Sequence, residues 1–242
     1  ENLKFIYGLP NEAALPGWIK NNFGILDKVK ISSYLYPVNI KNRIQGKLNW
    51  SFSSIVSSII AIFLYLIFKS KALINNSYKK IEVKEIYKCS DDWNSFWDKA
   101  KLSYDFIINR DKISTTWRYF ENPNKYNLIG LFFNGDLVGY LVYRIISDRN
   151  VKNTVIADFL TLPGYESALS FGLNTIVNES FKLGVDNIIL WCVENSKFSG
   201  VFKNQGFFKR DNIPVIFYQN SYSKEIVQSN SFHFTIGDSD NV

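Results

Sequence analysis

The sequence lacks methionine altogether and contains one histidine, His233, and two cysteines, Cys89 and Cys192, among 242 residues. Two cysteines are too few for a disulfide framework or for a structural zinc site, which needs four ligands. A single histidine excludes multi-histidine metal sites and leaves a Ser-His-Asp triad only one candidate base, close to the C-terminus. We therefore expect no metal cofactor, a reducing and cytoplasmic location, and chemistry based on carboxylates, hydroxyls, amides or backbone groups.

The sequence also lacks any run rich in lysine and arginine, although 28 Lys and Arg against 22 Asp and Glu give a net charge of +6. Because the excess is spread along the chain, we expect no nucleic-acid partner. Hydrophobic residues make up 46% of the chain and aromatic residues 17%, which is typical of a globular protein. The length allows one large domain, or one domain and part of another.

Only one long stretch, residues 50–68, is free of charge. These 19 residues are long enough to cross most of the ~30 Å hydrocarbon layer of a membrane as a helix. Serines dilute its first half, however, and basic residues flank both ends, so nothing orients it as a span. We expect a helix that packs against the protein or lies at a membrane surface, which would make the protein membrane-associated.

The sequence matches itself at an offset of 184 residues, with 5–23 lying over 189–207. Both copies predict an apolar strand, an Asn that caps a short helix, an aromatic residue facing the core, and a second strand. The matched positions are Asn11, Trp18 and Phe23 in the first copy and Asn195, Phe202 and Phe207 in the second. Chance agreement between two strand-helix-strand units is the alternative.

The repeat divides the chain into the last third of a first copy (1–36), a linker (37–80), a complete second copy (81–220) and a tail (221–242). In the second copy, periodicity predicts an α/β (α+β) fold with a mixed central sheet and helices on both faces. The expected strands are 81–87, 126–133, 137–146, 151–160, 187–193 and a terminal pair, 207–209 with 215–219. The expected helices are 90–108, 112–120, 165–184 and 196–204.

This order of elements, together with the repeat, resembles the GNAT superfamily of N-acetyltransferases. The marker is an Asn followed by an aromatic residue at +7 and by Gly-Phe at +11 and +12, which Asn195, Phe202, Gly206 and Phe207 meet. Two further stretches, Trp117-Arg118-Tyr119 and 232–240, look like those of two-copy bacterial GNAT proteins. Because the first residues already read as a strand with no beginning, we expect that the N-terminal part of the first copy is missing and that it pairs with this chain.

The resemblance implies acetyl-CoA as co-substrate, bound by the fourth strand of the second copy and the helix after it. The residues at these positions are Phe159, Leu160, Leu162, Gly164, Ser167, Ala168 and Asn195. The pyrophosphate loop of the family reads Arg/Gln-x-x-Gly-x-Gly/Ala, but here Pro163 replaces the Arg/Gln and Glu166 replaces the first Gly. We therefore expect weak donor binding, in a cleft beside Asn195 formed where the fourth and fifth strands separate after Leu160 and Val193.

The implied chemistry is attack of an amine on a thioester, which needs a base. Asp158 and Glu194 are the candidates by position, and solvated strand-end carboxylates are the alternative reading. The family's acid is a Tyr at the +7 aromatic position, which Phe202 and Trp18 cannot replace. Asn195 either bonds the pantetheine arm or caps the next helix.

Trp117, Arg118 and Tyr119 are candidates for binding the acceptor, which we expect to be a small-molecule or sugar amine. In this reading Arg118 binds an acidic group between two aromatic walls; in the alternative, both aromatics pack inward and Arg118 is a surface residue. Asp238 and Asp240 either bind a cation or belong to a solvated tail.

The function predicted from the sequence is a fragment of an N-acyltransferase whose complete copy is degenerate in donor binding. Two alternatives remain. One is a non-catalytic GNAT-like module for acceptor binding or domain pairing. The other is an aminoacyl-transferring enzyme of the peptidoglycan-bridge type, against which the lack of a basic cluster speaks.

Overall fold

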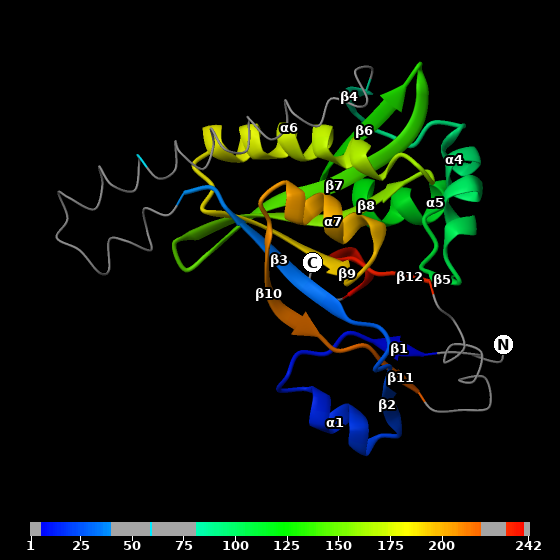
Figure 1. Cartoon of the computed structure of the whole chain (residues 1–242), viewed down its shortest axis with the longest axis vertical. Helices are drawn as coiled ribbons and strands as arrows, with labels where there is room; N and C mark the ends of the chain where they lie inside the picture. The colour runs from blue at the N-terminus through cyan, green and yellow to red at the C-terminus, as the bar shows by residue number, and fades with distance from the viewer. Residues whose placement is uncertain (1–5, 40–58, 60–80, 219–230, 240–242) are drawn as a thin grey trace.

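The computed structural model describes residues 6–39, 59, 81–218 and 231–239. Its centre is a mixed seven-stranded sheet in the order β10-β3-β9-β8-β7-β6-β4 (Figure 1). All neighbouring strands are antiparallel except β8 and β9, which are parallel. The strands are β3 (Ile31–Pro37), β4 (Ile81–Glu85), β6 (Asn127–Phe133), β7 (Asp136–Asp148), β8 (Val151–Thr161), β9 (Asn187–Val193) and β10 (Phe208–Ile213).

Helices cover both faces of this sheet, as the sequence predicts. On β7, Leu141 and Tyr143 point into the cluster under α6 and α7, whereas Tyr140 and Val142 point into the cluster under α4. This is the period-two alternation of a strand that is buried on both faces. The helical elements of the second copy are α4 (Trp93–Ala100) with η2 (Lys101–Ser103), α5 (Lys112–Thr115) with η3 (Thr116–Phe120), η4 (Glu166–Ala168) with α6 (Leu169–Lys182), and α7 (Lys197–Asn204).

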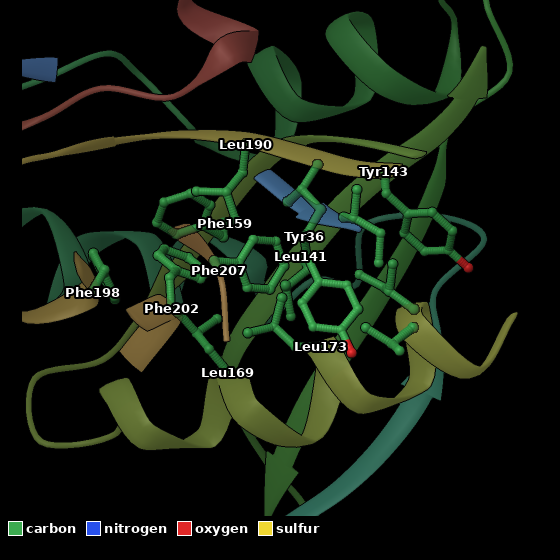
Figure 2. Packing of buried hydrophobic residues seen from close by; sticks show 14 of the residues in the cluster. Tyr36, Leu141, Tyr143, Phe159, Leu169, Leu173, Leu190, Phe198, Phe202 and Phe207 are labelled. Carbon is green, nitrogen blue, oxygen red and sulfur yellow. The ribbon is translucent and has the colours of Figure 1, made fainter. Parts of the chain in front are cut away.

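Aromatic and branched residues fill the larger of the two clusters (Figure 2). Leu169 and Leu173 of α6 point toward the sheet, and Phe202 of α7 packs edge-to-face on Phe159 of β8 with ring centroids 4.9 Å apart. The prediction that the aromatic residue at +7 faces the core is thus confirmed for Phe202. It is wrong for Trp18, which is 41% exposed.

The two segments that the sequence predicts to be copies exchange strands, because the last strand of each lies in the sheet of the other. The first copy contains β1 (Tyr7–Gly8), α1 (Leu15–Lys20), β2 (Phe23–Ile25) and β3, and β3 lies between β9 and β10 of the second copy. Conversely, β11 (Ile216–Tyr218) lies between β1 and β2. The terminal pair predicted for the second copy is therefore wrong, because β10 and β11 each pair with strands of the first copy.

The exchange agrees with the predicted repeat, since β3 and β11 occupy equivalent positions at the offset of 184 residues. The chain connecting β2 to β3 crosses to the second copy, and the backbone N–H of Leu26 donates to the carbonyl of Val215 at 2.8 Å. The hydrophobic pattern of one copy cannot reveal such an exchange, because β3 and β11 are equivalent strands and either could form the same hydrogen-bond ladder.

Two further predictions need correction. The helix expected over 90–108 ends at Ser103, after which Phe106 and Ile107 form the short strand β5. This strand pairs in parallel with β12 (Phe232–His233). The solvated tail expected over 221–242 is wrong for 231–239, where residues 232–236 are buried.

Other local predictions are confirmed. Asn134 and Gly135 both have positive φ, 52° and 92°, as a tight hairpin between β6 and β7 requires. The apolar helix expected over 50–68 lies outside the described residues, apart from Ile59. In the part of the chain that the structure describes, no helix has both the length and the apolar character needed to cross a membrane.

The exchanged strand predicts a large effect of a small substitution. Ile31 is fully buried on β3 between Val193 and Ile213. We expect Ile31→Ala to lower the free energy of unfolding by about 2–5 kcal/mol, measured by urea denaturation, because it leaves a cavity between the two copies. Ile19→Ala, at a position 48% exposed on α1, is the control and should change it by less than about 1 kcal/mol. Equal effects of the two substitutions would contradict the exchange.

Candidate active site

The parallel strands β8 and β9 separate half-way along their length. Their ladder joins Asn153–Ile156 to Asn187–Leu190 only. At this point β8 also carries a bulge, because Asp158 and Ile156 pair with successive residues of β7 and leave Ala157 without a partner there. A bulge bends its strand and increases the local twist. The predicted separation is confirmed, but it begins earlier than after Leu160 and Val193.

A cavity of about 390 Å³ lies where the two strands have separated. Its walls come from the end of β8, the loop before α6, the loop between β9 and α7, and Ser231 and Phe232 near the C-terminus. Thr161, Glu166, Glu194 and Asn195 are among its lining residues. The Thr161 hydroxyl is buried and has no hydrogen-bond partner in the described part of the chain.

Residues 231–239, called here the C-terminal segment, fill the deeper part of the gap. The ring of His233 is buried, and its Nε2 donates to the carbonyl oxygen of Phe159 on β8 at 2.9 Å. On the other side, Phe232 and Phe234 pack with Trp191 and Val193 of β9. A side chain of the protein itself, His233, therefore donates a hydrogen bond to a backbone carbonyl that does not pair with β9.

A buried arginine anchors this segment. Arg110 Nε donates to both carboxylate oxygens of Asp158 at 3.1 Å, and Nη2 donates to Asp238 Oδ2 at 2.7 Å. The Arg110 side chain is 1% exposed and the two carboxylates are completely buried. Tyr140 also donates to Asp158, at 2.9 Å. Arg110 thus joins β8 to the C-terminal segment through two ion pairs shielded from water.

These contacts determine the ionisation of the cluster. Burial by itself would raise the pKa of Asp158, but the adjacent Arg110 guanidinium holds this pKa below its usual value. For Arg110, burial acts to lower the pKa, and the Asp158 and Asp238 carboxylates more than offset it, so the pKa is raised. The Asp158 carboxylate and the Arg110 guanidinium are therefore charged at neutral pH.

No family model matches the sequence, and no curated protein matches it either. Solved structures do share its fold. A GCN5-related N-acetyltransferase from Anabaena variabilis ATCC 29413 superimposes with a TM-score of 0.51 at 11% identity, over 88% of this chain and 45% of that one. The chain has a GNAT-like fold. It spans less than half the length of that protein.

Two other similar structures are a conserved protein of unknown function from Enterococcus faecalis V583, a probable N-acyltransferase, and a functionally unknown protein from Staphylococcus epidermidis ATCC 12228. The first has a TM-score of 0.49 at 9% identity over 88% of this chain and 44% of that one. The second has a TM-score of 0.46 at 12% identity over 87% of this chain and 68% of that one.

Within the GNAT-like fold, the loop before α6 is the expected phosphate site, and its residues fit a phosphate poorly. Glu166 lines the cavity and pairs with Lys197 at 3.4 Å. Gly164 has a φ of 86°, but the glycine that would allow a second close approach is absent. A carboxylate near the start of α6 opposes an anion where backbone N–H groups would attract it.

Most of the other residues that the sequence predicts to bind acetyl-CoA are buried or form hydrogen bonds within the fold. Phe159 and Leu160 are fully buried, and the Leu162 N–H donates to the Val138 carbonyl at 2.8 Å. Ala168 is buried beneath α6, and Ser167 donates no side-chain hydrogen bond to a described residue. Of the predicted set, Asn195 lines the cavity.

The two loop asparagines differ in their capping role. Asn11 accepts from the N–H of Ala14 at 2.8 Å, as a helix cap does. Asn195 has a left-handed φ of 59°, and the cap of α7 is Ser196, which accepts from the N–H of Ser199. The capping alternative is therefore wrong for Asn195, and its amide lies beside the cavity.

The two candidate bases have different surroundings. Glu194 lines the cavity and accepts from Lys209 and Ser32, and the Lys209 hydrogen bond followed by that of Ser32 lowers its pKa. Asp158 is buried within the Arg110 cluster, so its reading as a solvated strand-end carboxylate is wrong. The role of either residue as a base stays a prediction, and the geometry favours Glu194 because it reaches the cavity.

Trp117, Arg118 and Tyr119 come together at a second cavity of about 540 Å³, called here the Trp117 cavity. Tyr126, Gly237 and Asp238 also line it. The alternative in which both aromatic residues pack inward holds for Tyr119, which is buried, and fails for Trp117, which is 69% exposed. Arg118 Nη1 donates to Asp238 Oδ1 at 3.3 Å.

Sequence reasoning missed Arg110, Tyr140 and the role of His233. An arginine that follows a short apolar run gives no signal of burial, because only the fold brings Asp158 and Asp238 to it from 48 and 128 residues away. In the described ranges, no group of three or more His, Cys, Asp or Glu side chains is arranged to hold a metal ion.

The buried ion pairs predict a strong dependence on Arg110. We expect Arg110→Met to lower the free energy of unfolding by about 3–5 kcal/mol in urea denaturation, because it leaves the buried Asp158 carboxylate without a counter-charge and Asp238 with only its 3.3 Å pair to Arg118. Lys101→Met is the matched control, since Lys101 forms an exposed pair with Asp98. It should cost less than about 1 kcal/mol. A similar small cost for Arg110→Met would contradict the anchoring role.

His233 predicts a pH dependence with a defined sign. Burial, and then the nearby Arg110, lower its pKa to about 3. Because the pKa in the unfolded chain is about 6.5, the unfolded state binds a proton below that pH that the folded state does not. The free energy of unfolding should therefore be highest above pH 6.5 and fall on acidification, by at most about 1.4 kcal/mol per unit, down to about pH 3.

His233 is the only histidine, so the test is direct. Urea denaturation between pH 5 and 8 should show this slope in the parent protein below about pH 6.5. In His233→Gln, which keeps an N–H donor for the Phe159 carbonyl, the slope should be absent between pH 5 and 6.5. An identical slope in both proteins would show that His233 titrates in the folded state.

Proposed function

We propose that the chain contributes to an N-acyltransferase that moves an acyl group from an acyl-CoA-type donor to an amine, and that its second copy is itself degenerate in donor binding. The observation that carries this proposal is the filling of the gap between β8 and β9 by the C-terminal segment. His233 occupies the Phe159 carbonyl, one of the backbone groups that an extended donor would use in this fold.

The acyl-CoA donor itself does not fit the residues present. Glu166 lies where the donor phosphates would lie, and Phe202 lacks the hydroxyl that would protonate a departing thiolate. The free cavity of about 390 Å³ leaves room for part of such a ligand. These features support a second copy that retains the fold and has lost the donor chemistry.

The alternative proposal, a non-catalytic module for domain pairing, draws support from the strand exchange. β3 of the first copy completes the sheet of the second copy, and β11 of the second copy joins β1 and β2 of the first. The second copy therefore supports the first copy whether or not the second copy binds a donor. The two proposals share the prediction for donor binding and differ in whether this copy takes part in a reaction. A cytoplasmic location, membrane-surface contact through 50–68 and pairing with first-copy residues remain proposals.

Calorimetry with acetyl-CoA tests degeneracy. We expect the dissociation constant to be millimolar or weaker, because losing two or three charge-assisted hydrogen bonds of roughly 1.5–3 kcal/mol each turns micromolar binding into millimolar binding or worse. A dissociation constant in the low micromolar range would contradict the proposal. Glu166→Gln should strengthen binding roughly two- to fivefold by removing the charge near the helix start. Asp98→Asn, an exposed carboxylate on α4, is the control and should leave binding unchanged.

A further inference from the structure

The Trp117 cavity is a second site, separate from the gap between β8 and β9. The C-terminal segment lies between the two, because Ser231 and Phe232 line the cavity at the strand separation whereas Gly237 and Asp238 line the Trp117 cavity. The volume of the Trp117 cavity, about 540 Å³, is large enough for a small organic molecule. Three consecutive residues of η3, Trp117, Arg118 and Tyr119, contribute to its lining.

Arg118 has hydrogen-bond donors to spare. A guanidinium carries five N–H groups. Within the described residues, Arg118 has one acceptor, Asp238 Oδ1, at the long distance of 3.3 Å. That carboxylate is already held by Arg110 at 2.7 Å and by the Thr235 N–H at 2.9 Å, so it does not depend on Arg118. With its side chain only 22% exposed, Arg118 presents unused N–H groups at a partly dehydrated wall.

Tyr119 provides an independent second donor. Its hydroxyl is buried and finds no partner among the residues that the structure describes, which is costly for a polar group. Burial, and then the Asp158 carboxylate, raise its pKa well above the usual value, so the hydroxyl keeps its proton. Gly237 lies against this hydroxyl, and a Cβ at that position would overlap it. Tyr119 lines the cavity, and its buried O–H keeps a proton that no described residue accepts.

The other walls are flat and apolar. Trp117 is 69% exposed, so its indole ring is accessible to a ligand. Tyr126 packs edge-to-face on Tyr119, with ring centroids 5.2 Å apart, and fixes the opposite side. Unused N–H and O–H donors next to an open indole face match a planar molecule that ends in an oxyanion.

We propose that the Trp117 cavity binds a small aromatic or similarly planar carboxylate, whose oxygens are received by Arg118 and Tyr119 and whose ring stacks on Trp117. Glu121 and Asp238 also line the cavity, and they favour a single negative charge over a phosphate dianion. The site involves no thioester donor, so this inference stands apart from the proposed acyl transfer and survives its failure.

Ligand-observed NMR titration with benzoate tests the proposal on the full chain, with benzamide and benzylamine as neutral and cationic probes of the same shape. We expect saturable binding of benzoate, at least about tenfold weaker binding of benzamide, and none of benzylamine, because charge-assisted hydrogen bonds are about twice as strong as neutral ones. Phenyl phosphate separates the two oxyanions: weaker binding than benzoate is expected, and tighter binding would overturn the assignment to a carboxylate.

Three variants locate the binding. Arg118→Gln should weaken benzoate about tenfold or more, and Trp117→Ala, at an exposed position that tolerates substitution, several-fold. Tyr119→Phe should weaken benzoate and yet raise the melting temperature of the unliganded protein, because it removes an unpaired buried hydroxyl. Arg210→Gln, a surface arginine paired with Asp211 outside the cavity, should leave binding unchanged.

Three further results would overturn the proposal. One is a failure of benzoate to bind, and another is a preference for benzylamine. The third is benzoate binding that is equally strong in the parent, in Trp117→Ala and in Tyr119→Phe, which would place the molecule elsewhere even if Arg118→Gln could not be folded. Acetyl-CoA binding is measured separately and has no bearing on either result.

Discussion

The buried guanidinium of Arg110 is the interaction on which the rest of the site depends. It bridges Asp158, on the bulged part of β8, and Asp238, at the end of the C-terminal segment. Two carboxylates without it would be repelled from one another and from the protein interior. With it, the segment can lie in the gap between β8 and β9, where Phe232, His233 and Phe234 complete the packing.

The strand exchange makes the two copies mutually dependent. A sheet that lacked β3 would leave β9 and β10 as unpaired edges, and a sheet that lacked β11 would leave β1 and β2 without a common neighbour. Each copy therefore supplies hydrogen bonds that the other cannot make for itself. The last strand of each of these segments therefore contributes to the packing of the other.

The cavity at the strand separation and the Trp117 cavity differ in how the chain satisfies their polar groups. At the strand separation, the protein satisfies the exposed backbone with its own His233, and Glu166 makes the loop before α6 unfavourable for phosphate. At the Trp117 cavity, by contrast, Arg118 and Tyr119 retain donors that the described residues do not use. The chain thus fills part of the gap at the strand separation, whereas at the Trp117 cavity it leaves hydrogen-bond donors without acceptors among the described residues.

Local sequence patterns were enough to determine most elements of the second copy. Alternation and turn residues placed β6, β7, β8, β9, α6 and α7 close to their observed bounds, because each buries one face or both and so carries its own period. The repeat predicted that 5–23 and 189–207 fold alike, and Trp117, Arg118 and Tyr119 line one cavity because they are consecutive in η3. The sequence pattern did not decide which of the two rings is buried, Trp117 or Tyr119.

Only the tertiary structure decided where the exchanged strands lie and that the C-terminal segment is buried. It also decided that the negative charge of Asp158 is paired with Arg110. Each of these is a long-range pairing between groups that look ordinary locally: two equivalent strands, a short run of aromatic residues, and one arginine. Which partner such groups find depends on the cost of leaving hydrogen bonds or charges unpaired in the assembled interior, and that cost exists only once the chain has folded.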